Sequence, residues 1–141
     1  MKVKDVLARK GSGVTTIRPS ASITELLGIL AEHRIGAAVV VEGDAVAGIV
    51  SERDVVRALN DSGAGLLEQP VRAIMTTEVS TCGPDDEVRA LARTMTERRF
   101  RHMPVLEEGK LAGIVTIGDI VKVRIDELET EQEQLTAYIS G

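Results

Sequence analysis

Apolar side chains along this chain recur first with a helical period and then with a strand period, and this order occurs twice. The first helical stripe has members at i, i+3, i+4 and i+7: Ile23, Leu26, Leu27 and Leu30. Just before it, Ser22 and Glu25 have the spacing of a capping box, in which each side chain satisfies a free amide at the helix start. The pattern therefore predicts an amphipathic helix that begins after Ser22.

A second stripe of the same kind follows later in the chain. Its apolar members are Val88, Leu91, Ala92 and Met95. Asp86 lies just ahead of them, and its short carboxylate is a side chain that often accepts from the free amides of a first turn. We therefore expect Asp86 to cap this second helix.

Each helical stripe is followed by two short apolar runs with a turn between them. The runs are residues 37–41 and 46–50 in the first case and residues 103–106 and 111–115 in the second. Each turn contains a glycine, Gly43 or Gly109, which favours a tight reversal. We expect two β-hairpins.

A hydroxyl residue, Ser51 or Thr116, follows each hairpin and is placed to cap a further helical pattern. A short extended piece precedes each cycle, at residues 14–17 and 79–82. One copy is thus β-α-β-β-α. The predicted fold class is α/β, with two such repeats.

The two copies align at one spacing without gaps. Residues 48–54, GIVSERD, return 65 positions later as GIVTIGD at residues 113–119, and Arg34 falls on Arg99 at the same offset. Repeated units of this kind bury their apolar faces against each other, and clefts form readily at the seam between them. We assign repeat 1 to residues 1–60, a turn-rich linker to 61–70 and repeat 2 to 71–126.

A helical pattern continues beyond the second repeat. Its apolar members are Val121, Ile125, Leu128, Leu135 and Ile139, interleaved with charged residues and glutamine. We expect residues 127–141 to form an amphipathic C-terminal helix or tail that docks on the body or on a partner chain. A frayed, solvated end is the alternative.

Composition narrows the classes of function. The formal net charge is −5 and the only aromatic residues are Phe100 and Tyr138, which argues against a nucleic acid polymer as partner. The single cysteine, Cys82, can form neither an internal disulfide nor a thiolate metal cluster, and we expect it to be a small buried hydrophobe. No segment approaches the roughly 20 apolar residues that span a bilayer, so we expect no membrane partner and a cytoplasmic location.

The doubled pattern Gly-Ile-Val-Ser/Thr-x-x-Asp and the run RHMPV at residues 101–105 carry a family resemblance. Together with the order of elements, they resemble a tandem pair of cystathionine-β-synthase-type (CBS) domains, a Bateman module, in its small stand-alone form. The resemblance implies two repeats related by a pseudo-two-fold axis. It also implies homodimers and clefts between the repeats that hold adenosine nucleotides such as AMP, ATP, NAD or S-adenosylmethionine.

Local chemistry and the resemblance together give candidate ligand-binding residues. A carboxylate near a helix start can accept from both hydroxyls of a ribose, which is the role expected for Asp54 and Asp119. Ser51 and Thr116 stand at helix starts, where free amides attract phosphates. The resemblance adds basic phosphate contacts, apolar walls for the adenine and hydroxyls at the cleft edge: Arg101, His102, Met103, Pro104, Val79, Ala38, Ser80, Thr81, Thr15 and Thr16.

The two clefts are not expected to be equal. Gly36 and Ala37 stand where the second copy has Arg101 and His102, so the first copy lacks its own phosphate cations unless Arg53 or His33 compensates. A neutral nucleoside, a different ligand or no ligand is then plausible in the first cleft. The cleft with Thr116 and Asp119 ranks ahead of the cleft with Ser51 and Asp54.

The two aspartates and the basic run each also have a purely structural interpretation. An aspartate after Ser or Thr near a helix start is often only a cap, and the basic run from Arg98 to Arg101 is also typical of a solvated helix end. If Asp54 and Asp119 both point away from a shared hollow, or are both consumed by internal ion pairs, the nucleotide hypothesis fails.

Enzymatic activity is not indicated, because no nucleophile is paired with a base and no His/Cys metal set is present. The leading hypothesis is a regulatory module, of the kind used in energy sensing. Its nucleotide shifts a dimer arrangement that an unknown target protein reads. The competing hypothesis is a constitutive protein-interaction scaffold with empty clefts, and a remote third is a small nucleotide hydrolase.

Overall fold

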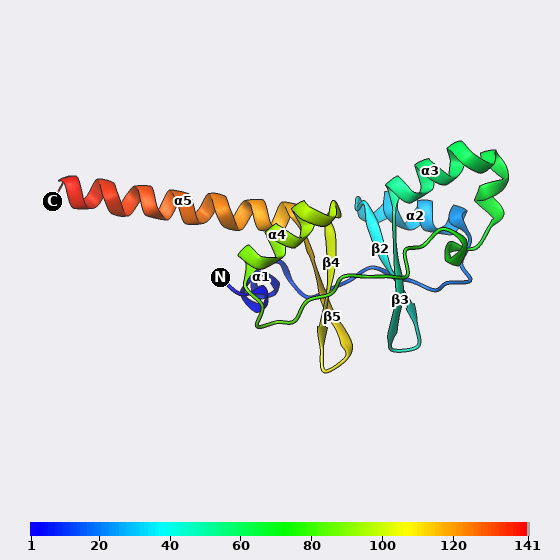
Figure 1. The fold of residues 1–141 in the computed structure, drawn as a ribbon, viewed down its shortest axis with the longest axis horizontal. Helices are drawn as coiled ribbons and strands as arrows, with labels where there is room; N and C mark the ends of the chain where they lie inside the picture. Colours follow the sequence, from blue (N-terminus) through cyan, green and yellow to red (C-terminus); the bar gives the residue numbers. More distant parts are fainter. Residues whose placement is uncertain (141) are drawn as a thin grey trace.

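The predicted hairpins and helices form two α/β units that lie side by side in the structure, a computed structural model that describes residues 1–140 (Figure 1). The first unit consists of β1 (Thr16–Ile17), α2 (Ile23–His33), β2 (Ala37–Glu42), β3 (Ala45–Ser51) and α3 (Glu52–Ser62). The second consists of α4 (Val88–Arg98), β4 (His102–Glu107), β5 (Lys110–Thr116) and α5 (Ile117–Ser140). The remaining elements are α1 (Val3–Lys10) and two 3₁₀ helices, η1 (Gly63–Glu68) and η2 (Val71–Ala73). The predicted class, α/β with two pseudo-two-fold-related repeats, is confirmed.

Both predicted hairpins are present. Strand β2 pairs antiparallel with β3, and β4 pairs antiparallel with β5; both ladders shift register at equivalent places, after Val40 and after Val105. The first extended piece is β1, which pairs parallel to β2. The second, predicted at residues 79–82, makes only one bridge, from Cys82 to Val105. Its sheet therefore has two strands instead of three.

The predicted caps at the helix starts are confirmed only in part. Ser22 caps α2, since the amide of Glu25 donates to its Oγ at 3.1 Å, but the Glu25 carboxylate pairs with Arg18 at 3.2 Å and does not close the predicted box. The prediction for Asp86 is wrong. The N-cap of α4 is Glu87, and Asp86 instead accepts from the amide of Gly83 at 2.8 Å, which stabilises the preceding turn.

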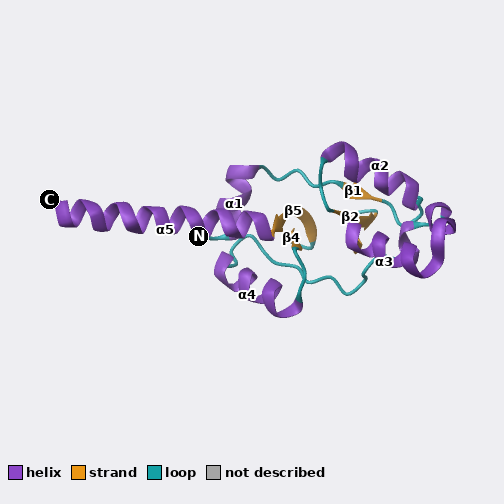
Figure 2. Cartoon of the chain, turned by 90° about the horizontal axis from the view of Figure 1, so that it is seen from above, coloured by secondary structure: helices purple, strands orange, loops and turns teal. Residues whose placement is uncertain are grey.

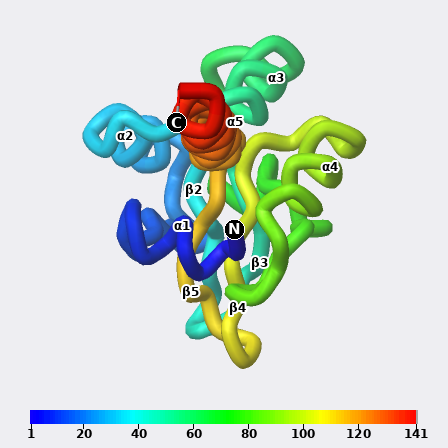
Figure 3. The backbone as a smooth tube through the Cα atoms, turned by 90° about the vertical axis from the view of Figure 1, so that its left-hand side faces the viewer, coloured from blue at the N-terminus to red at the C-terminus, as the bar shows by residue number. Residues whose placement is uncertain are grey.

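Each core includes a segment that precedes the other repeat. Val3 and Val6 of α1 are buried in the core of the second unit, whereas Val71 of η2 is buried in the core of the first. Figures 2 and 3 show α1 and α4 on opposite sides of the β4–β5 hairpin. The leading segments of the two repeats are thus exchanged.

Glycines in the repeated GIV motif allow this close packing. A Cβ at Gly48 would lie 2.6 Å from the carbonyl oxygen of Thr76, and one at Gly113 would lie 2.7 Å from a methyl group of Leu7. Gly48 is therefore required for the crossing segment to lie against the hairpin, because its neighbour is a backbone atom, whereas a larger residue at Gly113 would displace the flexible end of Leu7.

The stretch between the repeats is more ordered than its turn-rich composition suggests. Residues 61–70 were expected to be a linker, but α3 continues to Ser62 and η1 follows at once. Leu66 is buried in the core of the first unit, which fixes this stretch against the body. The free energy of burying an apolar side chain outweighs the weak helix propensity of the glycines.

The C-terminal pattern forms one continuous helix, α5, that extends beyond the body (Figure 1). Its first turns bury Ile120 and Val123 against the second core. The predicted stripe is instead exposed: Val121, Ile125, Leu128, Leu135 and Ile139. Docking of this stripe on the body of its own chain is therefore wrong, while docking on a partner chain stays a prediction. Among residues 1–140, no helix is both long enough and apolar enough to cross a bilayer.

Candidate ligand-binding cleft

A cavity of about 540 Å³ opens where the N-terminal end of α3 faces the second unit. Its walls come from three places: the β2–β3 hairpin with the start of α3, the segment after η2, and the segment that joins α4 to β4. The lining residues are Gly36, Ala37, Ile49, Ser51, Glu52, Arg53, Asp54, Arg57, Thr76, Glu78, Val79, Ser80, Arg98, Arg99, Phe100, Arg101 and His102. The cavity is therefore built by both units.

Asp54 is held at this cavity by a reciprocal cap. Its Oδ2 accepts from the amide of Ser51 at 2.8 Å and from the Ser51 hydroxyl at 3.0 Å, while its own amide donates to Ser51 Oγ at 3.2 Å. The cap expected from the structural alternative is thus present. Within residues 1–140, Oδ1 of Asp54 takes part in no hydrogen bond, so one carboxylate oxygen remains for a ligand.

Positive charge dominates the cavity wall. Five arginines line it: Arg53, Arg57, Arg98, Arg99 and Arg101. Within the described chain none of the five forms an ion pair, and Arg98 donates only to the Ser80 hydroxyl, at 3.1 Å. Three carboxylates share the wall, those of Glu52, Asp54 and Glu78. A positive concentration of this kind in a chain of net charge −5 creates a local potential that attracts anions.

The backbone at the end of α4 brings its arginines to the cavity. Arg99 ends the helix in the left-handed conformation, at φ 59°, as the equivalent Arg34 ends α2 at φ 54°. The chain turns there and enters β4 through Phe100 and Arg101. The basic run is therefore a helix end, as the alternative interpretation had it, and this end also faces the cavity.

His102 lines the cavity in a partly buried position. Burial lowers the pKa of its imidazole below the usual 6.5, and the charge of Arg101 lowers it further, while the neighbouring Glu52 partly offsets both effects. Gly36 lies between these groups, since a Cβ there would be 3.3 Å from Glu52 Oε1 and 3.9 Å from His102 Cε1. The surroundings of His102 thus favour the neutral imidazole, and its side chain lines the cavity.

The equivalent aspartate of the second unit is engaged differently. Asp119 Oδ2 accepts from the amide of Thr116 at 2.9 Å, as expected for a cap, and also from Lys10 Nζ at 2.7 Å. The same ammonium group donates to the carbonyl oxygen of Ile114 at 3.0 Å. Asp119 therefore differs from Asp54 by an internal ion pair, which uses the same oxygen as the cap.

The structure brings together six of the predicted site residues: Ser51, Asp54, Val79, Ser80, Arg101 and His102. Three others lie in the buried cores: Ala38, Met103 and Pro104. The rest lie outside the cavity lining: Thr15, Thr16, Thr81, Thr116 and Asp119.

The cavity groups two of these residues differently from the prediction. Arg101 and His102 were assigned to the cleft of Asp119, but they line the cavity of Asp54. The cause is the pseudo-two-fold packing, which places the start of β4 opposite the start of α3. The first cleft therefore does not lack cations, because the second repeat supplies them.

Several lining residues were not predicted as site residues. Arg57 lies one turn after Arg53, which had been considered as a compensating cation, so the two arginines share a face of α3. This spacing is a signal that the sequence contains. The contributions of Thr76 and Glu78 carry no such signal, because they depend on the exchange of segments. His33 is not part of the lining.

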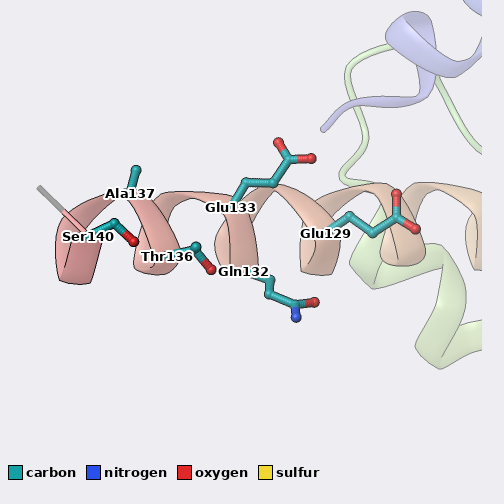
Figure 4. Close-up of a pocket in the computed structure, with 6 residues that line it drawn as sticks. All are labelled: Glu129, Gln132, Glu133, Thr136, Ala137 and Ser140. Carbon is teal, nitrogen blue, oxygen red and sulfur yellow. The ribbon is translucent and has the colours of Figure 1, made fainter.

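A second hollow, on α5, has no opposite wall (Figure 4). All six of its lining residues belong to that one helix: Glu129, Gln132, Glu133, Thr136, Ala137 and Ser140. A small-molecule site normally surrounds most of its ligand. This hollow is a gap between exposed side chains, and the cavity at Asp54 is the stronger candidate.

Comparison with known families identifies the repeated unit. The CBS domain model matches residues 3–61 and again residues 71–126. Among curated proteins, the mitochondrial CBS domain-containing protein CBSX3 of Arabidopsis thaliana is 38% identical over 117 residues, which cover 79% of this chain and 57% of that protein. The chain thus spans little more than half the length of CBSX3. YhcV of Bacillus subtilis is 30% identical over 119 residues, 84% of this chain and 81% of YhcV.

Solved structures agree with this assignment. The CBS-domain protein ATU1752 from Agrobacterium tumefaciens superposes with a TM-score of 0.86 at 47% identity, over 88% of this chain and 99% of that one. The CBS domain pair of MJ0100, in complex with 5′-methylthioadenosine and S-adenosyl-L-methionine, gives a TM-score of 0.80 at 27% identity, over 90% and 98% of the two chains. The doubled match, the exchanged fold and the cleft between repeats establish that this chain belongs to the CBS domain family as a tandem pair.

Proposed function

We propose that this CBS pair is a non-catalytic regulatory module that binds an anionic adenosine nucleotide in the cleft at Asp54. The observation that carries the proposal is the set of five arginines without carboxylate partners around a cavity of about 540 Å³. Cavities of about 300–1,000 Å³ are typical of small-molecule sites, and a mononucleotide is within that range.

The arginines suit the phosphate end of such a ligand. A guanidinium group binds phosphate oxygens through two parallel hydrogen bonds, and each charge-assisted bond contributes about 1.5–3 kcal/mol. Arg53 and Arg57 reach the cavity from α3, while Arg98 and Arg101 reach it from the second unit. The start of α3 adds the positive end of a helix dipole.

The rest of the cavity suits a nucleoside. Asp54 retains a free carboxylate oxygen, which can accept from a ribose hydroxyl. Apolar side chains from both units, including Ile49, Val79 and Phe100, supply surfaces against which an adenine ring can pack.

The relative MJ0100 supports an adenosine ligand, because its CBS pair was solved with 5′-methylthioadenosine and S-adenosyl-L-methionine. The charge of the present cavity favours a different member of that class. Methylthioadenosine has no phosphate, and S-adenosylmethionine carries a sulfonium cation that arginines repel. Among the ligands expected from the resemblance, AMP, ATP and NAD fit better.

Binding in this cleft would act on the arrangement of the two units. A ligand that contacts Arg57 of α3 and Arg101 before β4 joins groups from both repeats. Such a ligand stabilises the arrangement of the two units in which these groups are closest together. The size of the stabilisation equals the difference in the ligand's binding free energy between the arrangements. We further propose that a homodimer of this module presents the change to a target protein.

Thermal unfolding with a matched series of ligands tests the proposal. AMP, ATP and NAD should each raise the midpoint, since a ligand at a hundredfold over its dissociation constant adds about 2.7 kcal/mol. Adenosine and methylthioadenosine, which lack phosphate, should bind at least roughly tenfold more weakly, and added salt should narrow the difference.

Other outcomes have clear meanings. Equal affinity for AMP and adenosine would remove the arginines from the site. No stabilisation by any member of the series would favour the scaffold with empty clefts. Release of products from ATP during incubation would contradict the non-catalytic assignment.

A further inference from the structure

The exposed face of α5 has a regular order that nucleotide binding does not explain. Five apolar residues and Gln132 together follow a 4-3-4-3-4 spacing. The six positions, named here the α5 seam, are Val121, Ile125, Leu128, Gln132, Leu135 and Ile139. This is the heptad repeat of a coiled coil, with Ile125, Gln132 and Ile139 at a and the others at d.

The body of the molecule does not use the α5 seam. Ile120 and Val123, which are buried in the second core, point away from it by about a third and nearly half of a turn, because each residue of an α-helix advances by about 100°. Leu128, Leu135 and Ile139 are 47%, 62% and 80% exposed. Every residue from 128 to 140 is exposed. A solitary helix of this length is only marginally stable in water, so the pattern requires a second helix to cover it.

We propose that the α5 seam pairs with the same seam of a second copy of this chain, as a parallel, in-register, two-stranded coiled coil. The choice of two strands follows from the side chains at the seam. Isoleucine at a with leucine at d favours dimers over trimers and tetramers. Gln132 lies at the central a position, where a polar residue pairs with its own equivalent and thereby fixes the register.

Charges beside the seam determine the direction. In the parallel arrangement, Arg124 at position g faces Glu129 of the partner subunit at position e, and this attraction occurs twice by symmetry. An antiparallel arrangement that places Gln132 opposite Leu128 of the partner subunit would instead bring Glu129 next to its own equivalent, and likewise Glu131. It would also bury the Gln132 amide against an apolar side chain, which is unfavourable. Figure 4 shows Gln132 extending outward from the helix.

Sedimentation of the full chain over a range of concentrations tests the pairing. The wild type should dimerise, and Leu128→Glu with Leu135→Glu should weaken the dimer by roughly a hundredfold or more, because two charges are then buried in each strand of the seam. Thr130→Glu with Ala137→Glu places the same charges on the opposite face and should change the dissociation constant by less than about threefold. All four residues are exposed, so circular dichroism of the monomers should be alike.

A wild-type chain that remains monomeric would overturn the proposal. A dimer that survives both seam substitutions would also overturn it, since assembly would then use another surface. So would equal weakening by the two pairs of substitutions, because this would indicate a general charge effect.

Cross-linking tests direction and register separately. Gln132→Cys should form an intermolecular disulfide in the parallel, in-register arrangement, whereas Glu133→Cys, one residue away and off the seam, should not. Cys82 does not interfere, because it is buried and its thiol pKa is raised to about 12. A disulfide from Glu133→Cys alone, or a dimer without any disulfide from Gln132→Cys, would contradict this arrangement.

A charge exchange supplies a third measurement. Arg124→Glu should weaken the dimer by about tenfold, since it faces Glu129 of the partner subunit with a like charge. Adding Glu129→Arg should restore most of the affinity. Failure of the double variant to recover would exclude the proposed contact between positions g and e.

Discussion

The two helix starts that carry the repeated motif have the same capping geometry and different surroundings. The amide of Asp54 donates to Ser51 Oγ at 3.2 Å, and the amide of Asp119 donates to Thr116 Oγ1 at the same distance. Yet Asp54 faces a cavity with five arginines, whereas Asp119 is paired with Lys10. Equivalent motifs thus do not make equivalent sites.

The difference arises in the exchanged segments. Lys10 and Met75 are equivalent residues at the offset of the repeat, and each lies against the hairpin of the other copy. Met75 packs beside Gly48, and the next amide, that of Thr76, donates to the carbonyl oxygen of Ile49 at 2.8 Å. In the other unit, Lys10 Nζ binds the equivalent carbonyl of Ile114 and reaches Asp119. One difference between the repeats therefore gives the Asp119 carboxylate an ion pair that the Asp54 carboxylate does not have.

Substitution of the α3 arginines should cause the largest loss of nucleotide affinity. We expect Arg53→Ala with Arg57→Ala to weaken AMP binding roughly a hundredfold or more in calorimetry, because each lost charge-assisted hydrogen bond contributes about 1.5–3 kcal/mol. Lys122→Ala is the control for the Arg57 substitution, since Lys122 is the repeat equivalent of Arg57 on α5. An equal loss in the control would show that general charge, and not the cavity, attracts the nucleotide.

The two aspartates give the next largest contrast. Asp54→Ala should weaken nucleotide binding by about tenfold to a hundredfold, whereas Asp119→Ala should change it by less than about threefold. Both variants lose a cap, at a cost of about 1 kcal/mol, and Asp119→Ala also loses the ion pair with Lys10. The variant expected to keep its affinity is thus the less stable one, so a weaker affinity of Asp54→Ala cannot come from stability alone. The reverse order would transfer the site to the second unit.

Lys10 should contribute to folding stability. The ion pair between Lys10 and Asp119 is partly buried, with side chains that are 29% and 20% exposed. Lys10→Met removes this pair and should lower the free energy of unfolding, measured by urea melts, by about 1 kcal/mol. Lys4→Met is a control on the same helix, because its pair with Asp85 is mostly exposed, at 57% and 78%. If both variants lose the same stability, the position of Lys10 is not special.

The smallest expected effect is a pH dependence at His102, whose equivalent in the first repeat, Ala37, does not titrate. Because the native pKa of His102 lies below 6.5, the unfolded chain binds more protons between these two values. The ligand-free protein should therefore gain stability as pH rises through this interval and lose it as pH falls. His102→Gln should flatten this part of the profile in melts at several pH values, and an unchanged profile would assign the effect to another group.

Local patterns in the sequence predicted most of the fold. Ser22, Ser51 and Thr116 cap helices as expected, and the runs around Gly43 and Gly109 form hairpins. These features depend on residues a few positions apart, which periodicity and capping chemistry describe well. Asp86 was misassigned because a carboxylate at that position can close a turn as readily as it can cap a helix.

The same local patterns identified individual residues of the candidate site but not how they group. Asp54, Arg101 and His102 were identified as candidates, but their membership of one cavity was not. The contact between Lys10 and Asp119 spans 109 positions in the chain. No local pattern encodes such a contact.

The amino-acid sequence by itself determined that this protein has two related α/β repeats, with acidic caps at equivalent helix starts and a long apolar stripe near its end. Periodicity, capping and the doubled motif are properties of neighbouring residues, so they can be recognised in the sequence alone. Only the tertiary structure decided which repeat supplies the cations to which aspartate, and that Lys10 neutralises the other. Charges act through space, and the crossing of the leading segments brings together groups that lie far apart along the chain.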